Sequence, residues 1–65
     1  MGSGYYVQLR KILLDHNCSF VRQGKGSHEI WRNPENDRNF PVAVTIISRH
    51  LANEILKQAG LKIKI

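Results

Sequence analysis

Hydrophobic and polar positions follow two different periods along this 65-residue chain, and the first segment has the period of a helix. Over residues 3–17, apolar side chains recur every three or four positions, which gathers them on one stripe of a helix. The stripe consists of Tyr5, Tyr6, Leu9, Ile12 and Leu13. Ser3 is the candidate N-cap and Asn17 a candidate terminator. We therefore predict a helix over residues 3–17 with one buried face.

Two segments on either side of a Gly-Lys-Gly turn have the composition of a β-hairpin. Residues 19–23 and 27–33 contain β-branched and aromatic side chains. Glycine can take the positive φ that a tight hairpin needs. His28 and Ile30 alternate with Trp31, so we expect Trp31 to face the opposite side of the sheet from His28, as a partly buried member of the core.

A third strand is predicted after the turn signal Pro-Glu-Asn-Asp. It covers residues 38–46, with Phe40, Val42 and Val44 on one face. Pro41 has no N–H to donate to a neighbouring strand, so this strand should lie at an edge of the sheet. The last strand of an antiparallel meander also lies at an edge.

A second helix is predicted over residues 49–59, with Ser48 as its N-cap. Gly60 stands where a left-handed residue commonly ends a helix. The expected buried face consists of Leu51, Ile55, Leu56 and Ala59. The remaining segment, Leu-Lys-Ile-Lys-Ile, alternates apolar and basic residues. It can form a short strand or, over residues 62–65, a loose tail, and the sequence leaves both open.

The predicted order is α-β-β-β-α, an α+β fold in which two helices cover one face of a three-stranded antiparallel sheet. The other face of the sheet is left for solvent or a ligand. A chain of 65 residues is long enough for one domain, which we place at residues 1–65. Residues 1–4, Met-Gly-Ser-Gly, are typical of a cloning remnant or a disordered end, and the sequence leaves their origin open.

Charge and composition narrow the functional classes. Ten Lys and Arg against five Asp and Glu give a net charge of +5. This bias favours a polyanionic partner, either nucleic acid or an acidic protein, while a basic protein with nothing to bind is the alternative. No apolar run approaches the ~20 residues of a membrane span, and the N-terminus lacks the apolar core of a signal peptide. We therefore expect a cytoplasmic protein without membrane association.

Three histidines are the first candidates for chemistry. His16 falls in the last turn of the first predicted helix, where a cation suits the helix dipole, and we interpret it as structural. His50 falls in the first turn of the second helix, beside Arg49. A plain surface histidine and a contact with RNA or a partner are both open for His50.

His28 differs because of its neighbours. Glycines permit close approach, backbone amides and Lys25 supply hydrogen-bond donors, and an imidazole can transfer a proton near neutral pH. This combination suits a phosphate group. An ordinary hairpin histidine has the same pattern, so residue types alone leave both interpretations open.

The sequence contains no motif for metal binding or for nucleotide-cofactor binding. No zinc-ligand spacing is present, and neither is a phosphate-binding loop or a dinucleotide fingerprint. The five carboxylates form no cluster of the kind that a two-metal nuclease needs. We therefore predict neither a metal nor a cofactor. Cys18, the one cysteine, is interpreted as a small buried thiol. The aromatic side chains include candidates for base stacking.

Two motifs resemble the HicA-type toxins, small bacterial mRNA interferases of toxin–antitoxin systems. The segment FVRQGKGSHEIWRNP, residues 20–34, resembles the family's signature. The segment SRHLANEILKQAGL, residues 48–61, is similar to the family's closing helix. The order of elements also matches, so the likeness extends over nearly the whole chain.

The resemblance implies a fold like that of the double-stranded-RNA-binding domain. It implies RNA cleavage that depends on His28, which the motif residues Gly26 and Ser27 precede. It also implies an antitoxin of the HicB type that binds the toxin and blocks its active site. Arg49 and His50 match the basic pair at the start of the final helix in one branch of the family.

We therefore expect the toxin of a type II toxin–antitoxin system, a metal-independent endoribonuclease in which His28 is the general base and Arg22 and Lys25 bind phosphate. The alternative is a non-catalytic module of the same fold that binds RNA or the antitoxin. Glu29 stands where some members carry another histidine, so no second imidazole is carried over there. The general acid is open, with His50 a candidate if the fold brings it near. The oligomeric state is open as well, with a monomer favoured.

Overall fold

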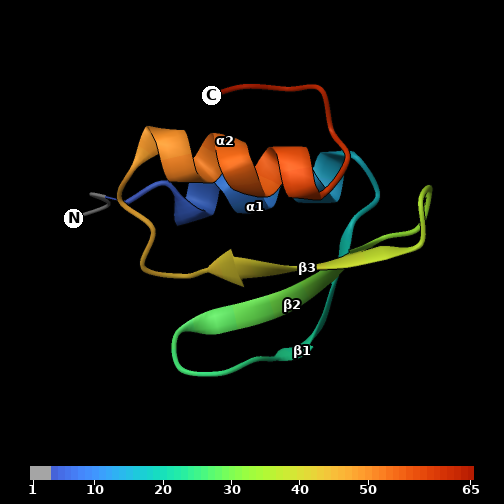
Figure 1. Cartoon of the computed structure of the whole chain (residues 1–65), viewed down its shortest axis with the longest axis horizontal. Helices are drawn as coiled ribbons and strands as arrows, with labels where there is room; N and C mark the ends of the chain where they lie inside the picture. Colours follow the sequence, from blue (N-terminus) through green and yellow to red (C-terminus); the bar gives the residue numbers. More distant parts are fainter. Residues whose placement is uncertain (1–3) are drawn as a thin grey trace.

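The computed structural model describes residues 4–65 and has two layers (Figure 1). The elements, in chain order, are α1 (Tyr6–Asp15), β1 (Ser19–Gln23), β2 (His28–Asn33), β3 (Arg38–Ala43) and α2 (Arg49–Gln58). The strands form one antiparallel sheet in the order β1-β2-β3. Both helices lie on the same side of that sheet. The predicted α-β-β-β-α fold is confirmed.

Helix α1 begins at Tyr6, later than predicted, and it ends at Asp15. Tyr5 occupies the N-cap position without a side-chain hydrogen bond to the helix, while its backbone N–H donates to the Ile46 carbonyl over 2.9 Å. The predicted cap, Ser3, lies outside the described residues. Asn17 has a φ of 67°, a left-handed conformation that ends the helix and turns the chain toward β1.

The strands match the prediction closely except at the end of β3. This strand ends at Ala43 and does not continue to residue 46. Phe40 and Val42 are buried as predicted, but Val44 lies beyond the strand and is only half-buried. The chain turns there because it must leave the sheet to start α2 in the other layer. Pro41 lies on an edge strand, as predicted.

The hydrophobic core lies between the sheet and the two helices. It is formed by side chains from all five elements except β1, together with Cys18 and Ala59 beside the helix ends. Its buried members are Leu9, Leu13, Cys18, Trp31, Phe40, Val42, Leu56 and Ala59. The Trp31 indole is the largest fully buried side chain. Its place in the core is confirmed, and it is buried more completely than predicted.

The predicted buried face of α2 was partly wrong. Ser48 caps the helix as predicted, because its Oγ accepts a hydrogen bond from the Leu51 amide at 3.3 Å. Leu51 itself is 54% exposed, and Ala52 is fully buried in its place. The helix is rotated so that Ala52, Leu56 and Ala59 form the inward stripe, and Leu51 lies about 100° away from Ala52 around the helix.

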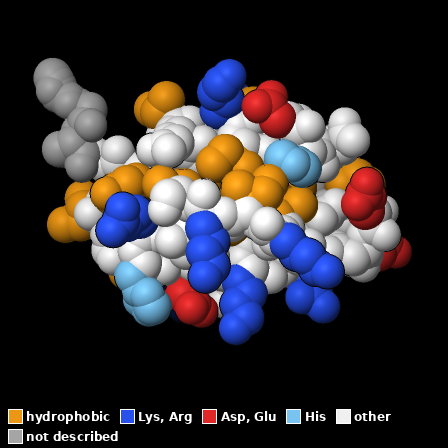
Figure 2. Space-filling model, turned by 90° about the horizontal axis from the view of Figure 1, so that it is seen from above, with side chains coloured by type: hydrophobic (Ala, Val, Ile, Leu, Met, Phe, Trp, Pro, Cys, Tyr) orange, Lys and Arg blue, Asp and Glu red, His pale blue; other side chains and the backbone are white. Residues whose placement is uncertain are grey.

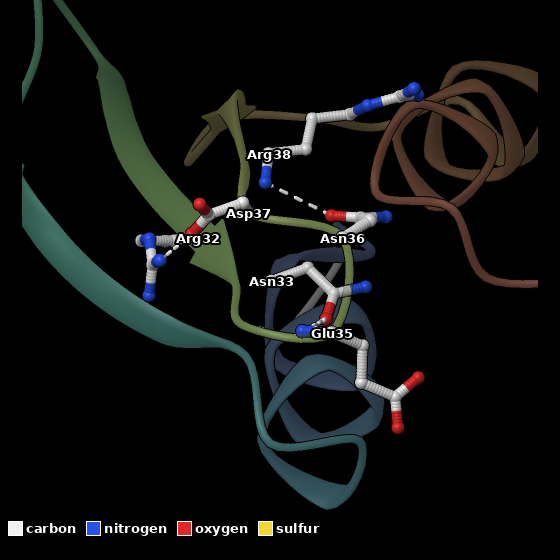
Figure 3. Close-up of polar contacts among 6 residues, drawn as sticks. All are labelled: Arg32, Asn33, Glu35, Asn36, Asp37 and Arg38. Carbon is white, nitrogen blue, oxygen red and sulfur yellow. Dashed lines mark hydrogen bonds and ion pairs between the residues drawn. The ribbon is translucent and has the colours of Figure 1, made fainter.

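The C-terminal end of α2 is held by the turn between β2 and β3. Figure 3 shows the polar contacts within this turn. The Nδ2 groups of Asn33 and Asn36 both donate to the Ala59 carbonyl, at 2.7 and 3.0 Å. Within the turn, Asn33 Oδ1 accepts from the Glu35 amide. The turn thereby satisfies a helix-end carbonyl that has no partner inside the helix.

The segment after α2 forms no strand, and it packs against the rest of the molecule. Its apolar side chains Leu61, Ile63 and Ile65 pack against the core, and the Ile65 amide donates to Asn53 Oδ1 at 2.7 Å. In Figure 1 this tail runs back along α2 on the side away from the sheet. No helix among residues 4–65 is long and apolar enough to cross a membrane.

Candidate functional site

The loop between β1 and β2 fixes the backbone around His28. The Gly24 amide donates to the His28 carbonyl at 2.8 Å, and the His28 amide donates to the Lys25 carbonyl at 3.1 Å. Gln23 Nε2 adds a second donor to the His28 carbonyl at 2.9 Å. Gly26 has a φ of +59°, which supplies the left-handed residue of the turn. His28 therefore begins β2 from a well-defined backbone position.

The His28 side chain faces the side of the sheet away from the helices, which we call the outer face. His28 pairs with Ala43 across β2 and β3, whereas Trp31, three positions on, pairs with Phe40 on the helix-covered face. Side chains alternate along a strand, so the two residues face opposite sides, as predicted. The imidazole is exposed to solvent.

An irregularity in β1 brings Arg22 to the same outer face. Phe20 pairs with Trp31, and the register then shifts so that Arg22 pairs with Ile30. A regular strand would place Arg22 on the same face as Phe20, two residues earlier. The extra residue, Val21, forms a bulge that moves Arg22 to the face of Ile30 and His28. The alternation of side chains along the sequence does not predict this bulge.

The other residues of the hairpin loop lie next to His28. Lys25 and Gly26 are exposed at the tip, and a methyl group added at Gly26 would meet no atom within 4 Å. The Ser27 carbonyl accepts from the Val44 amide at 2.9 Å. Ser27 Oγ lies 3.4 Å from Thr45 Oγ1. These contacts attach the loop to the segment after β3, and they bring Thr45, which the sequence did not single out, to the site.

Arg49 and His50 are the first residues of α2, and both are exposed. His50 is not part of the cluster around His28, because it lines an open groove of about 760 Å³ between α2 and the C-terminal tail. The groove is lined by His50, Asn53, Glu54, Lys57, Leu61, Lys62, Ile63 and Lys64. The tail lies on the side of α2 away from the sheet (Figure 1). His50 therefore faces the helical side of the molecule, whereas His28 faces the outer side of the sheet.

Basic side chains gather on the helical side too. Figure 2 views this side from above and shows Lys and Arg side chains along one margin, next to a hydrophobic patch. Three lysines of the α2–tail groove, Lys57, Lys62 and Lys64, belong to this side of the molecule. The sequence placed none of them in a site, because their grouping depends on the tail folding back over α2.

Glu29, which the sequence left without a role, accepts two hydrogen bonds through one oxygen. The Tyr6 hydroxyl donates to Glu29 Oε1 at 2.8 Å, and Trp31 Nε1 donates to the same atom at 3.0 Å. Burial raises the pKa of the Tyr6 hydroxyl above its usual value, and the hydrogen bond and negative charge of Glu29 raise it further. The carboxylate is thus held in one orientation from α1 and from its own strand.

A small groove opens beside this carboxylate at the β1 edge of the sheet. It has a volume of about 370 Å³, and we call it the Phe20 groove. It is lined by Tyr6, Arg10, Leu14, Ser19, Phe20, Glu29 and Trp31. The Phe20 ring is 50% exposed and meets the buried Trp31 ring edge to face, with 6.3 Å between ring centroids. An aromatic face, a cation and a carboxylate therefore line one accessible hollow.

The two other residues considered for chemistry have structural roles. His16 follows α1, and its Nδ1 lies 3.0 Å from the Ile12 carbonyl, so the ring closes the end of the helix. Cys18 is a buried member of the core, and burial raises the pKa of its thiol, with the Glu35 charge adding to the effect. A raised thiol pKa opposes nucleophilic use. Among residues 4–65, no group of three His, Cys, Asp or Glu side chains is placed to hold a metal ion.

Comparison with models of protein families gives a match. The model of a protein family described as "HicA toxin of bacterial toxin-antitoxin" matches residues 7–61. The matched range contains the hairpin with His28, the bulged strand with Arg22, and α2. The search of curated proteins and the search of solved structures give no match.

Proposed function

Because this chain belongs to the HicA toxin family of bacterial toxin–antitoxin systems, we propose that it acts as a metal-independent endoribonuclease that cleaves mRNA in the cytoplasm. The observation that carries the proposal is the position of His28. Its imidazole is exposed on the outer face of the sheet, at the end where a glycine turn and Arg22 meet. An RNA strand can reach this position without any rearrangement of the core.

His28 acts as the general base in this proposal. The imidazole takes the proton from a ribose 2′-hydroxyl, and the 2′-oxygen attacks the adjacent phosphorus. The bond from phosphorus to the 5′-oxygen of the next nucleotide then breaks. The products are a 2′,3′-cyclic phosphate and a 5′-hydroxyl. Proton transfer by a positioned side chain is typically worth about 10²–10⁴-fold in rate.

The negative charge that develops on the phosphate is stabilised by residues of the hairpin. Arg22 lies on the face of His28, and Lys25 is exposed at the loop tip, so both cations can approach one phosphate. The amides of residues 25–27 are the backbone donors available to this role, because the Gly24 amide already donates to the His28 carbonyl. Donors that face the developing charge stabilise the transition state.

His50 does not fit the role of general acid. It lines the groove between α2 and the tail, on the other side of the molecule from His28. We therefore assign protonation of the departing 5′-oxygen to a water molecule, which the exposed site admits. His50 is left to bind RNA or a partner from the helical side, and Arg49 is left as an exposed cation at the start of α2.

The proposed partner is an antitoxin of the HicB type that neutralises the toxin by covering His28. The chain has a net charge of +5, so an acidic antitoxin surface would be attracted to it. Binding over the hairpin would exclude RNA from the same face. The complex should therefore lack ribonuclease activity, and excess antitoxin should restore growth of cells that express the toxin.

The test is His28→Ala compared with His16→Ala, which removes an exposed imidazole at the end of α1. We expect His28→Ala to remove growth arrest in a bacterial host and RNA cleavage in vitro, while His16→Ala keeps both. Cleavage by the unaltered chain should persist in a metal chelator and leave a 2′,3′-cyclic phosphate, identified by mass spectrometry. Efficient cutting of a substrate with 2′-deoxyribose at the cleaved position would rule out attack by the 2′-hydroxyl.

One observation favours a second function, a module of the same fold that binds RNA or the antitoxin without catalysis. In the described part of the chain, no carboxylate or carbonyl forms a hydrogen bond with the His28 imidazole to orient it. Catalytic bases usually have such a partner. If expression of the unaltered chain is harmless and RNA is bound but never cut, the binding module is the correct description.

A further inference from the structure

We propose that the Phe20 groove binds one unpaired nucleobase of the RNA, and that Glu29 selects for bases that present an amino group. This inference rests on the proposed ribonuclease function. It concerns a site on the helix-covered face of the sheet, whereas the residues proposed for cleavage are on the outer face. The groove volume of about 370 Å³ lies at the low end of the ~300–1,000 Å³ common for small-ligand sites.

The Phe20 ring provides a surface for stacking. Half of this residue is exposed, although it is among the larger hydrophobic side chains of a small protein. The edge-to-face contact with the buried Trp31 ring holds the Phe20 ring in place. Bases of single-stranded RNA stack on exposed aromatic side chains, and every base can make this contact.

Glu29 is the residue that distinguishes between the bases. Its Oε1 already accepts from the Tyr6 hydroxyl and from Trp31 Nε1, so the carboxylate is fixed before a ligand arrives. The second oxygen, Oε2, can accept a further hydrogen bond from the groove. A carboxylate only accepts. The exocyclic amino groups of adenine, cytosine and guanine can donate to it. Uracil has no amino group, and its one base donor, N3–H, lies between two carbonyl oxygens that repel a carboxylate.

Arg10 supplies the positive charge that a nucleotide needs beside a carboxylate. It lines the same groove and lies close enough to the Tyr6 hydroxyl to oppose, in part, the rise of that group's pKa. Its guanidinium can pair with the phosphate of the bound nucleotide. The groove therefore contains complementary partners for a base and for its phosphate.

The position of the groove links it to the cleavage site. Glu29 follows His28 in β2, and the two side chains face opposite sides of the sheet. Strand β1, which separates the two sites at the open edge, is exposed along its whole length. An RNA strand can therefore pass around this edge, with its scissile phosphate at His28 and a neighbouring base in the groove.

The experiment measures binding without cleavage, in the His28→Ala background, with cytidine and uridine hexaribonucleotides. Trp31 is the one tryptophan and lines the groove, so its fluorescence reports on occupancy. We expect tighter binding of the cytidine hexamer. Phe20→Leu should weaken both hexamers about tenfold, as for the loss of one base stack. Glu29→Gln offers an amide donor to uracil, and should reduce the preference for cytidine by about tenfold.

Leu51→Ala is the matched control, because Leu51 is as exposed as Phe20 and lies on α2. Equal weakening by Leu51→Ala and Phe20→Leu overturns the proposal. The proposal is also overturned if Glu29→Gln changes the cytidine-to-uridine affinity ratio by less than twofold. This outcome counts only if thermal unfolding shows that the variant is folded. Loss of antitoxin binding with unchanged RNA binding would assign the groove to a protein partner and also overturn it.

The two proposals fail in different ways. If the hexamers bind but the groove variants behave like the control, the nucleobase site is wrong and the ribonuclease proposal stands. If His28→Ala continues to cut RNA, the assignment of the base is wrong, and the groove is still judged by the hexamer preference. If neither hexamer binds at all, both proposals are wrong.

Discussion

The Tyr6 hydroxyl donates a hydrogen bond to the Glu29 carboxylate over 2.8 Å, and this contact joins α1 to the strand that begins with His28. The two residues are 23 positions apart in the chain. The contact is half-buried, so the carboxylate gives up part of its hydration and receives the hydroxyl and the Trp31 indole N–H in return. One side chain of the first helix thus orients the acid beside the proposed catalytic residue.

Tyr6→Phe should lower the free energy of unfolding by about 1–2 kcal/mol, because it keeps the ring and removes a hydrogen bond to a charged group. Urea denaturation followed by Trp31 fluorescence measures the change. Tyr5→Phe is the control, since Tyr5 precedes the helix and makes no cap with its side chain. A Tyr6 variant as stable as the Tyr5 variant would show that the contact contributes nothing.

The same contact should make stability depend on pH in the alkaline range. The pKa of Tyr6 is raised in the folded state from its usual 10.0, chiefly by burial and then by Glu29. The unfolded chain therefore loses this proton at a lower pH than the folded chain. The stabilisation is fully present below about pH 10, and is lost as the pH rises through the folded-state pKa.

The measurement compares the original chain with Tyr6→Phe in urea from about pH 8 to about pH 11. The difference in unfolding free energy should be constant at first and should shrink above about pH 10. Every titratable group other than Tyr6 is common to the two proteins, so the difference isolates the contribution of Tyr6. A difference that grows with pH would contradict the assigned direction of the pKa shift.

Two glycines with positive φ should differ in their tolerance of alanine. Gly26 has a φ of +59° with open space around it, whereas Gly60 has a φ of +86° and faces the Asn36 amide. Gly26→Ala carries only the cost of a left-handed alanine, about 1 kcal/mol. Gly60→Ala should cost more, because the new methyl group displaces Asn36 from its hydrogen bond with Ala59. Thermal unfolding of both variants makes the comparison, and equal losses would contradict it.

The salt dependence of RNA binding should show which side of the molecule the RNA contacts. Each neutralised phosphate of a single strand adds about −0.7 to the slope of log K against log salt. Arg22→Gln and Lys25→Gln, measured in the His28→Ala background, should each reduce the slope by about that amount. Lys62→Gln, in the groove on the helical side, should leave it unchanged. The reverse result would move the RNA site to α2 and the tail.

The elements of the fold were largely predictable because their signals are local. The residues Ser48, Pro41 and Gly60 act through their own backbone chemistry, and the structure uses each as predicted, as a cap, an edge residue and a helix stop. The boundaries of β1 were correct for the same reason. The predicted burial of Leu51 was wrong. Helical periodicity shows which residues share a stripe, but it does not show how the helix is rotated against its neighbours.

The candidate site was predictable only in part. A hairpin that presents His28 on the face opposite Trp31 follows from alternation along one strand. The role of Glu29 as acceptor for Tyr6 and Trp31 did not follow, because it depends on how α1 packs over the sheet. The grouping of lysines beside His50 depends likewise on the path of the tail.

The sequence by itself determined the order of helices and strands, and it led to the proposal of His28 as the general base, since both depend on short segments and intrinsic chemistry. Only the tertiary structure decided which side chains share a face. The bulge at Val21 moved Arg22 to the face of His28, and the two-layer packing placed His50 on the other side of the molecule. Strand register and layer packing arise from contacts between distant segments, which no local pattern contains.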